Sequence, residues 1–400
     1  MAEWANGGMI SQGVQQHSGL REIAVLFLKL GATAFGGPAA HVAMMRDEVV
    51  TRRRWLSDRE FLDLVAATNL IPGPNSTELA IHIGHRQAGW PGLFVAGAAF
   101  ILPATLIVGT LAWAYVHYGA RPDVRSLFYG IAPVVIAIVA HALWGMAKTA
   151  ISSAWLAVLG GASATAVLLG MHELAVLAGA VVIAMMGSMA NGFRGGTGTL
   201  AGVAAICAVR PGGVAAAVMA VATATTAVSL STLFWLFLKT GAVLFGSGYV
   251  LLAFLRADFV DRLGWLTETQ LLDAIAIGQF TPGPVFTTAT FIGYLLAGTP
   301  GAGLATLGIF LPAFFYVAVS APFIPRLRQS KTMGAVLDGV TVASLALMAI
   351  VTWQLGRASL VDGVTVAIAL VSLGSLLTTR VNSAWLILGG AIAGLLTRAL

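Results

Sequence analysis

The chain has 400 residues, of which 58% are hydrophobic and only 10% are charged, against about 25% charged in a typical soluble domain. This composition excludes a soluble globular protein and predicts an all-α polytopic membrane protein, because several charge-free runs exceed the roughly 20 residues that span a bilayer. The net charge of +6 does not indicate nucleic acid, because the basic residues lie mostly in short loops between apolar runs.

The first predicted helix spans residues 22–36, and an amphipathic helix follows over residues 39–54. Lys29 lies inside the first helix, where a lysine near the bilayer centre costs roughly 2.5–3.5 kcal/mol on insertion scales. The break after this helix contains paired small residues, which let the backbone approach a ligand closely. The candidate substrate-binding residues are therefore Lys29, Phe35, Gly36, Gly37 and Pro38. A lysine that only snorkels to the interface is the alternative interpretation.

A re-entrant hairpin is predicted around the triplet Pro72-Gly73-Pro74. Its incoming limb, over residues 57–69, opens with a Ser-x-x-Glu capping box, and its return limb covers residues 75–87. Proline ends the incoming helix and glycine permits the reversal. Neither limb is long enough to cross a membrane, and non-helical backbone at membrane depth is tolerated only inside protein or beside water.

The residues at the apex of this hairpin predict a site that binds an anion. The return limb begins with free N–H groups, and a helix N-terminus carries about half a positive charge. The candidate binding residues here are Pro72, Gly73, Pro74, Asn75, Ser76 and Thr77. Glu78 and His82 are candidates for carrying a coupling proton, because a lone intramembrane carboxylate can do so. Ordinary capping by the polar residues and a water-exposed Glu78 are the alternatives.

Four further spans are predicted near residues 91–117, 124–148, 151–170 and 174–190, and the whole pattern then recurs. The triplet reappears as Pro282-Gly283-Pro284, at an offset of 282 − 72 = 210 residues. Residues 27–36 match residues 237–246 with seven of ten identical, and the offset falls to 209 after a one-residue slip. The second set of candidate binding residues is Lys239, Gly246, Ser247, Gly248, Pro282, Gly283, Pro284, Thr287 and Thr288.

The repeat predicts two homologous halves, 1–195 and 229–400, joined by a Gly- and Ala-rich apolar linker at 196–228. Each half has about five transmembrane helices and one re-entrant hairpin, which gives 10–12 spans in total. An odd number of spans per half predicts inverted repeats, which are common in secondary transporters. Five arginines in loop 46–59, against two in the matching loop 256–269, predict that the first loop is cytoplasmic.

Several classes of site are not indicated by the sequence. The sequence shows no pair of catalytic carboxylates, no nucleophile with a base and no group of metal ligands. An enzyme is therefore not expected, and no cofactor is predicted. The single cysteine, Cys207, allows no intrachain disulfide. His82 and His85 have helical spacing, but a metal site is not predicted, because the sequence has no cluster of acidic or thiol residues beside them.

The motifs resemble those of the chromate ion transporter family, in its long form with two fused halves. The residues that carry this resemblance are Phe35-Gly36-Gly37-Pro38, Pro72-Gly73-Pro74-Asn75-Ser76-Thr77-Glu78, Phe245-Gly246-Ser247-Gly248-Tyr249 and Gln279-Phe280-Thr281-Pro282-Gly283-Pro284. The resemblance implies export of chromate from the cytoplasm across a bacterial inner membrane, driven by the proton-motive force or by anion exchange. It also implies sulfate as a related ligand, and a homodimer is possible. A carrier for uptake or exchange of sulfate or another small anion is the alternative.

Overall fold

The computed structural model describes residues 19–35, 37–192, 228–245, 248, 250–320, 331–379 and 381–399. Within these ranges the chain is almost entirely helical and contains no strand. The predicted linker lies outside the described residues, except for its last position. Gly36, Gly246 and Ser247 also lie outside them.

Half one contains seven α-helices and a π-helix in its described residues. They are α1 (Leu20–Thr33), α2 (Gly37–Arg46), η1 (Asp47–Arg52), α3 (Asp58–Thr68), α4 (Asn75–Tyr118), α5 (Pro122–Ala150), α6 (Ala154–Leu168) and α7 (Glu173–Gly192). The four later spans therefore lie close to their predicted positions. The first helix ends at Thr33, earlier than predicted, because Ala34 leaves the helical region at φ −80°, ψ 96°. The predicted amphipathic helix starts at Gly37 and becomes a π-helix at Asp47.

Half two repeats this order. Its described elements are α10 (Leu230–Val243), α11 (Leu251–Leu255), η2 (Arg256–Arg262), α12 (Glu268–Phe280), η3 (Val285–Thr287), α13 (Thr288–Ser320), α15 (Lys331–Ser359), α16 (Gly363–Thr378) and α17 (Ser383–Ala399). The predicted capping box is present at the start of α3, and a matching one of Thr267 and Gln270 is present at the start of α12.

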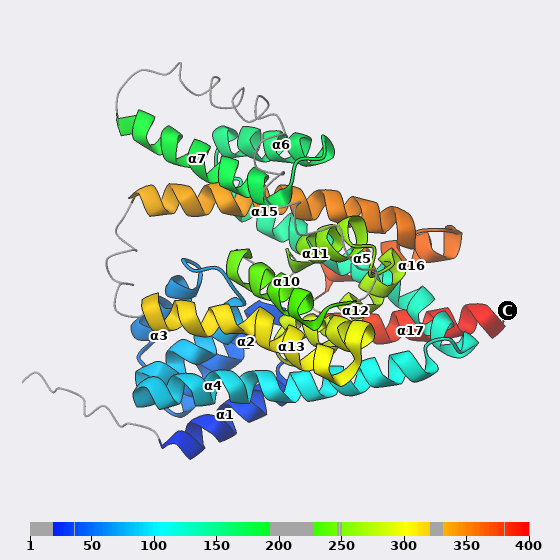
Figure 1. Cartoon of the computed structure of the whole chain (residues 1–400), viewed down its shortest axis with the longest axis horizontal. Coiled ribbons are helices and arrows are strands. Elements are labelled where there is room, and N and C mark those ends of the chain that lie inside the picture. The colour runs from blue at the N-terminus through cyan, green and yellow to red at the C-terminus, as the bar shows by residue number, and fades with distance from the viewer. Residues whose placement is uncertain are drawn as a thin grey trace, which may run out of the picture.

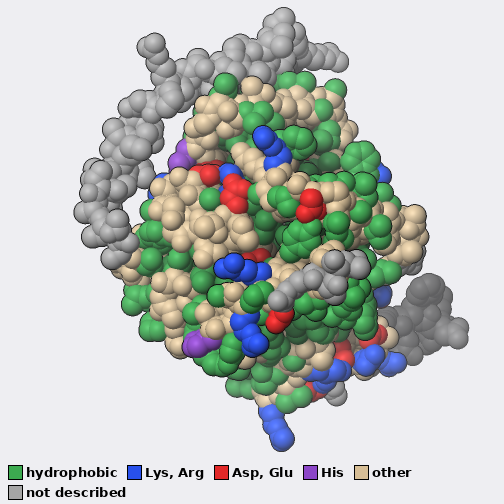
Figure 2. All heavy atoms as spheres, turned by 90° about the vertical axis from the view of Figure 1, so that its right-hand side faces the viewer, with side chains coloured by type: hydrophobic (Ala, Val, Ile, Leu, Met, Phe, Trp, Pro, Cys, Tyr) green, Lys and Arg blue, Asp and Glu red, His purple; other side chains and the backbone are tan. Residues whose placement is uncertain are grey.

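Four helical segments are long and apolar enough to cross a bilayer: Asn75–Tyr118, Pro122–Ala150, Val285–Ser320 and Gly334–Ser359. Five shorter apolar helices accompany them in the described part of the chain. Large hydrophobic side chains such as Leu168, Trp235 and Trp385 are exposed, and Figure 2 shows hydrophobic side chains over much of one end of the molecule. A surface of this kind is suited to contact with lipid.

The return limb and the next span turn sharply at the same place in both halves. α4 leaves helical geometry at Ala88 and Gly89, and α13 does so at Ala297 and Gly298. Just before this corner, a Cβ on Gly84 would lie 2.3 Å from the carbonyl oxygen of Gly92. The two limbs of the corner are therefore in backbone contact, which only a residue without a side chain allows.

The helices form two bundles (Figure 1). The hairpin bundle consists of α1–α4 and α10–α13, with α4 packed against α13. The outer bundle consists of α5–α7 and α15–α17. In the outer bundle α5 packs against α16 and α17 of the other half, and α15 packs against α6 and α7 in return. This exchange of partners is the pattern that a two-fold rotation between the halves produces.

Candidate functional site

The two Pro-Gly-Pro apexes are each held by the other half. Gly73 adopts φ +138° and Gly283 adopts φ +90°, which L-residues with a side chain rarely do. The backbone N–H of Gly73 donates a 2.7 Å hydrogen bond to the carbonyl oxygen of Leu244, and Gly283 donates a 2.9 Å bond to Ala34. Leu244 and Ala34 directly follow the last residues of α10 and α1. Each hairpin apex is thereby fixed to the first helix of the opposite half.

The two return limbs start differently from each other. Pro74 and Pro284 have extended ψ values of 92° and 126° and precede the helix. In half one the α-helix begins at Asn75, whereas half two inserts the 3₁₀ turn η3 before α13. The N–H groups at the two apexes are therefore not arranged identically.

Apex one contains buried polar groups without partners. Ser76, Thr77 and Glu78 are all buried, and Glu78 is 0% exposed. The Thr77 hydroxyl and both Glu78 carboxyl oxygens have no hydrogen-bond partner among the described residues. A Cβ placed on Gly73 would lie 2.2 Å from Oε1 of Glu78, so this carboxyl lies directly against the apex. The interpretation of Glu78 as a water-exposed surface residue is wrong.

Two further residues of the first return limb have distinct surroundings. Asn75 donates a 2.8 Å hydrogen bond from Nδ2 to Oδ1 of Asn69, which links the two limbs of the hairpin. His82 lies one helical turn after Glu78 and is buried, and its Nε2 has no hydrogen-bond partner among the described residues. Because residues four apart lie on one helix face, Glu78 and His82 form a short buried polar row.

Apex two is lined by hydroxyl groups that already donate hydrogen bonds to the backbone. Thr287 and Thr288 are buried, and their hydroxyls donate to the carbonyl oxygens of Pro284 at 2.8 Å and Val285 at 2.9 Å. Thr288 also lines a small cavity with Gly248, Gln279 and Val139, the last from α5 of half one. The hydroxyls therefore close the first turn, as in ordinary capping, while their oxygens remain able to accept.

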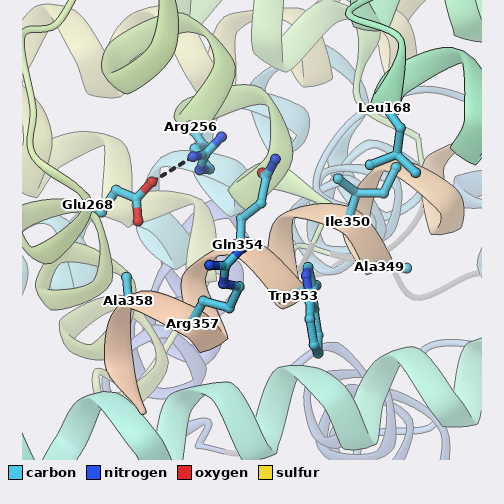
Figure 3. A pocket seen from close by; sticks show the side chains of 9 residues that line it. All are labelled: Leu168, Arg256, Glu268, Ala349, Ile350, Trp353, Gln354, Arg357 and Ala358. Carbon is cyan, nitrogen blue, oxygen red and sulfur yellow. Dashed lines mark hydrogen bonds and ion pairs between the residues drawn. The ribbon is translucent and has the colours of Figure 1, made fainter. Parts of the chain in front are cut away.

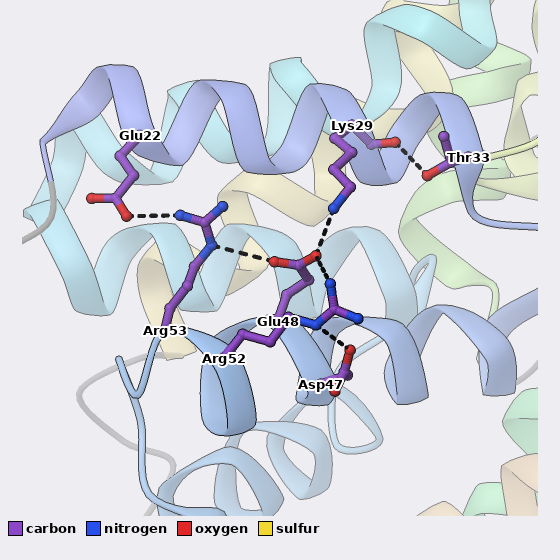
Figure 4. A network of polar contacts seen from close by, with 7 residues as sticks. All are labelled: Glu22, Lys29, Thr33, Asp47, Glu48, Arg52 and Arg53. Carbon is purple, nitrogen blue, oxygen red and sulfur yellow. Dashed lines mark hydrogen bonds and ion pairs between the residues drawn. The ribbon is translucent and has the colours of Figure 1, made fainter.

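Both predicted lysines form ion pairs. Lys29 Nζ lies 2.7 Å from Oε1 of Glu48 in η1 (Figure 4). In half two, Lys239 Nζ lies 2.5 Å from Oδ2 of Asp258 in η2. The two carboxylates are buried and occupy matching positions, since 258 − 48 = 210. Each lysine is thus held by a carboxylate. Neither substrate binding alone nor snorkelling to the interface would require such a partner.

Arginines complete both clusters. Arg53 pairs with Glu48 at 3.4 Å and with Glu22 at 2.7 Å. In half two, Arg262 pairs with Asp258 at 2.8 Å. The π-helices place these groups, because a π-helix has about one residue more per turn than an α-helix and turns a different set of side chains inward. The ion pairs therefore fasten each π-helix to the first helix of its own half.

The face of α1 opposite the lysine meets the second apex. A Cβ on Gly31 would lie 2.4 Å from the carbonyl oxygen of Phe100, and one on Gly283 would lie 2.8 Å from the carbonyl oxygen of Gly31. Near the break, Phe35 is exposed and Gly37 starts α2 at φ +79°. Of the predicted residues, each triplet is brought to the end of the first helix of the other half, whereas the lysines are directed toward η1 and η2.

Sequence reasoning also missed the buried carboxyl of Asp273. Asp273 of α12 is buried, and its Oδ2 accepts a 2.7 Å hydrogen bond from the hydroxyl of Tyr115 in α4. Its match to Asp63 at offset 210 was visible in the sequence, but nothing there distinguished a buried member of the pair. Among the described residues, no group of three or more His, Cys, Asp or Glu side chains is placed to hold a metal ion.

These helices define a multi-pass membrane protein built from two related halves, and comparison with known proteins identifies its family. A family model described as chromate transporter matches residues 21–187 and 231–395. A probable chromate transport protein of Synechococcus elongatus is 33% identical over 384 residues, covering 94% of this chain and 95% of that protein. A chromate transport protein of Cupriavidus metallidurans is 31% identical, covering 94% of this chain and 92% of that protein.

A chromate transport protein of Pseudomonas aeruginosa is similar at 32% identity, covering 92% of this chain and 90% of that protein. No solved structure matches the chain. The chain belongs to the chromate transporter family, which makes it a transporter rather than an enzyme.

Proposed function

We propose that this protein carries chromate across a bacterial inner membrane, in which it lies as a multi-pass protein surrounded by lipid. Transport is directed out of the cytoplasm and is driven by the proton-motive force or by exchange for another anion. The names of three relatives that match nearly the whole chain support chromate as the substrate. The positive-inside pattern of loop 46–59 supports the orientation, with the two halves, 1–195 and 229–400, inverted in the membrane.

The observation that carries this proposal is the reciprocal attachment of the two apexes. Gly73 is bound to Leu244, and Gly283 is bound to Ala34. Each interrupted helix thus meets the end of the first helix of the opposite half, within the hairpin bundle. In secondary transporters, discontinuous helices of two related repeats form the substrate site, and their N-termini favour anions. The N–H groups of Gly73 and Gly283 are used in these bonds, so a tetrahedral dianion would be bound by the remaining N–H groups at the starts of the two return limbs.

The lysines are directed toward η1 and η2 rather than toward the apexes, so they would act on the anion outside this site, by exchanging partners. A dianion that reaches Lys29 or Lys239 competes with Glu48 or Asp258, which hold the ammonium groups in the described structure. Glu78 has the role of the proton-coupling group. It is the carboxyl that lies against an apex, and burying an unpaired charge there is costly, so its charge must change together with the anion's position.

The second candidate function is uptake or exchange of sulfate or another small anion. Chromate and sulfate share charge and shape, and backbone N–H donors alone distinguish them poorly. Flux measurements in everted membrane vesicles test both functions together. Isotopically labelled chromate and sulfate are supplied with and without an imposed proton gradient. Chromate accumulation in everted vesicles that depends on the gradient or on a counter-anion supports the proposal. Sulfate flux with no chromate flux overturns it in favour of the alternative.

A further inference from the structure

The outer bundle covers one hairpin and leaves the other open. α12 packs against α5, α15 and α17, and all residues from 271 to 279 are buried. The equivalent helix α3 has its main contacts with α2 and α4 and lies at the edge of the molecule (Figure 1). Leu62 of α3 is 58% exposed, whereas its counterpart Leu272 is 3% exposed. The two hairpins are equivalent in sequence but not in their surroundings.

The difference in surroundings arises from how the two bundles are placed against each other. Inside the outer bundle, the contacts of α5 with α16 and α17 mirror those of α15 with α6 and α7. Inside the hairpin bundle, the contact of α1 with α4 mirrors that of α10 with α13. Within each bundle the two halves are therefore related by a two-fold rotation. The placement of one bundle against the other does not follow this rotation. Two such bundles have a second arrangement of similar contacts, in which the outer bundle covers α3 and exposes α12.

We propose that the outer bundle alternates between α12 and α3, so that the exposed face of α3 is the docking surface for the outer bundle of the same chain. This inference rests on the proposed transport function, because the alternation would open the two apexes in turn. Arrangements that bury equivalent surfaces differ little in free energy, and a difference of a few kcal/mol is small enough for a bound ion to reverse.

The cavity between the bundles follows the same asymmetry. A cavity of about 780 Å³ lies beside α15, and Arg256, Glu268, Trp353 and Arg357 are among its lining residues (Figure 3). Their counterparts in half one, at offsets of 210 for the first two and 209 for the last two, are Arg46, Asp58, Trp144 and Lys148. The Arg256 side chain is 12% exposed, but that of Arg46 is 51% exposed. The asymmetry is therefore carried by Arg256 and Glu268, which are less exposed than Arg46 and Asp58. Trp353 and Trp144 are both exposed and do not differ in this way.

The residues that would exchange places can be named. Val139 of α5 and Gln279 of α12 line the same small cavity over apex two. Their two-fold counterparts are Met348, since 139 + 209 = 348, and Asn69, since 279 − 210 = 69. Asn69 is exposed in the described arrangement. In the alternate arrangement Met348 would lie over apex one beside Asn69, as Val139 now lies beside Gln279.

Paired cysteines test the alternation in the full chain in membranes. In a Cys207→Ser background, one variant carries Val139→Cys with Gln279→Cys and a second carries Met348→Cys with Asn69→Cys. A matched control carries Thr290→Cys with Thr306→Cys, whose hydroxyl oxygens lie 2.7 Å apart within the hairpin bundle. We expect all three pairs to crosslink. Crosslinking the first or second pair should abolish anion flux reversibly, whereas the control crosslink should leave flux intact.

Two results overturn the inference. One is that the Met348/Asn69 pair never crosslinks, with chromate, sulfate or a proton gradient of either direction, while the control pair does. The other is that a single Leu62→Cys variant crosslinks to a second copy of the chain, which would make the α3 face a dimer interface. Crosslinking reports the arrangement whichever ion is carried. If both pairs crosslink and chromate is not moved, the proposed function fails while the alternation stands.

Discussion

The backbone N–H of Gly73 donates a 2.7 Å hydrogen bond to the carbonyl oxygen of Leu244, across the boundary between the two halves. The same bond is repeated between Gly283 and Ala34 at 2.9 Å. Each bond joins a hairpin apex, where the chain has left helical geometry, to a residue just past the end of a first helix. Because unpaired backbone groups are costly inside a membrane, these bonds help to make interrupted helices possible there.

Substitution of the apex glycine tests how much the site depends on this geometry. Gly73→Ala should destabilise the protein by about 1–3 kcal/mol, since φ +138° is strained for alanine, and should greatly reduce flux. The new Cβ would also meet the Glu78 carboxyl. Gly303→Ala is the control, because its Cβ would enter open space in α13. Thermal unfolding and vesicle flux measure both, and equal flux in the two variants would contradict a functional role for the apex.

The role of the lysine ion pairs is tested by removing the charge of one partner and then of both. Lys29→Met should lower stability by only about 1 kcal/mol, because the Lys29 side chain is half exposed and Arg52 and Arg53 still pair with the Glu48 carboxylate. Lys29→Met combined with Glu48→Met should recover stability. If Lys29 binds the anion, this double variant folds but does not transport. Recovered flux would show that the lysine only balances Glu48. Lys29→Arg should not rescue transport, because a planar guanidinium presents its donors differently.

Glu78→Gln tests proton coupling. The amide fills the same buried position without a titrating group, so substrate binding and counterflow exchange should persist. Flux driven by an imposed proton gradient should be lost. His82→Gln, one turn further along α4, separates the two candidates for the proton-carrying group. Gradient-driven flux that is unchanged in Glu78→Gln would exclude this carboxyl and favour His82 or simple anion exchange.

The capping box of α3 predicts a pH dependence of stability. Hydrogen bonds from the backbone N–H and hydroxyl of Ser57, together with Arg86, hold the pKa of Glu60 below its ordinary value of 4.5. A lowered pKa contributes stability above the ordinary value, and this contribution is lost as pH falls through the lower folded value. Glu60→Gln, which copies Gln270 of α12, should remove this part of the acid sensitivity in thermal unfolding. Ser57→Ala should cost about 1 kcal/mol.

The sequence predicted local features well, because they depend on nearby residues. The capping boxes, the breaks at the triplets and the later spans follow from the side chains at those positions. The carboxylate partner of Lys29 was not predictable in this way, since Glu48 reaches it from a π-helix that no local propensity indicates. The burial of Asp273 but not of Asp63 depends on where the outer bundle sits, which the sequence of the hairpins does not encode.

The difference between Glu78 and its counterpart Thr288 has a consequence for how such a protein can be built. An assembly of two identical halves would carry two carboxyls at its apexes or none. A single fused polypeptide escapes this restriction, because each copy of the duplicated segment can acquire its own residue. Here one apex has a carboxyl and the other has a hydroxyl at the matching place. Fusion after duplication thus allows one copy of the segment to carry a titrating group that the other copy lacks.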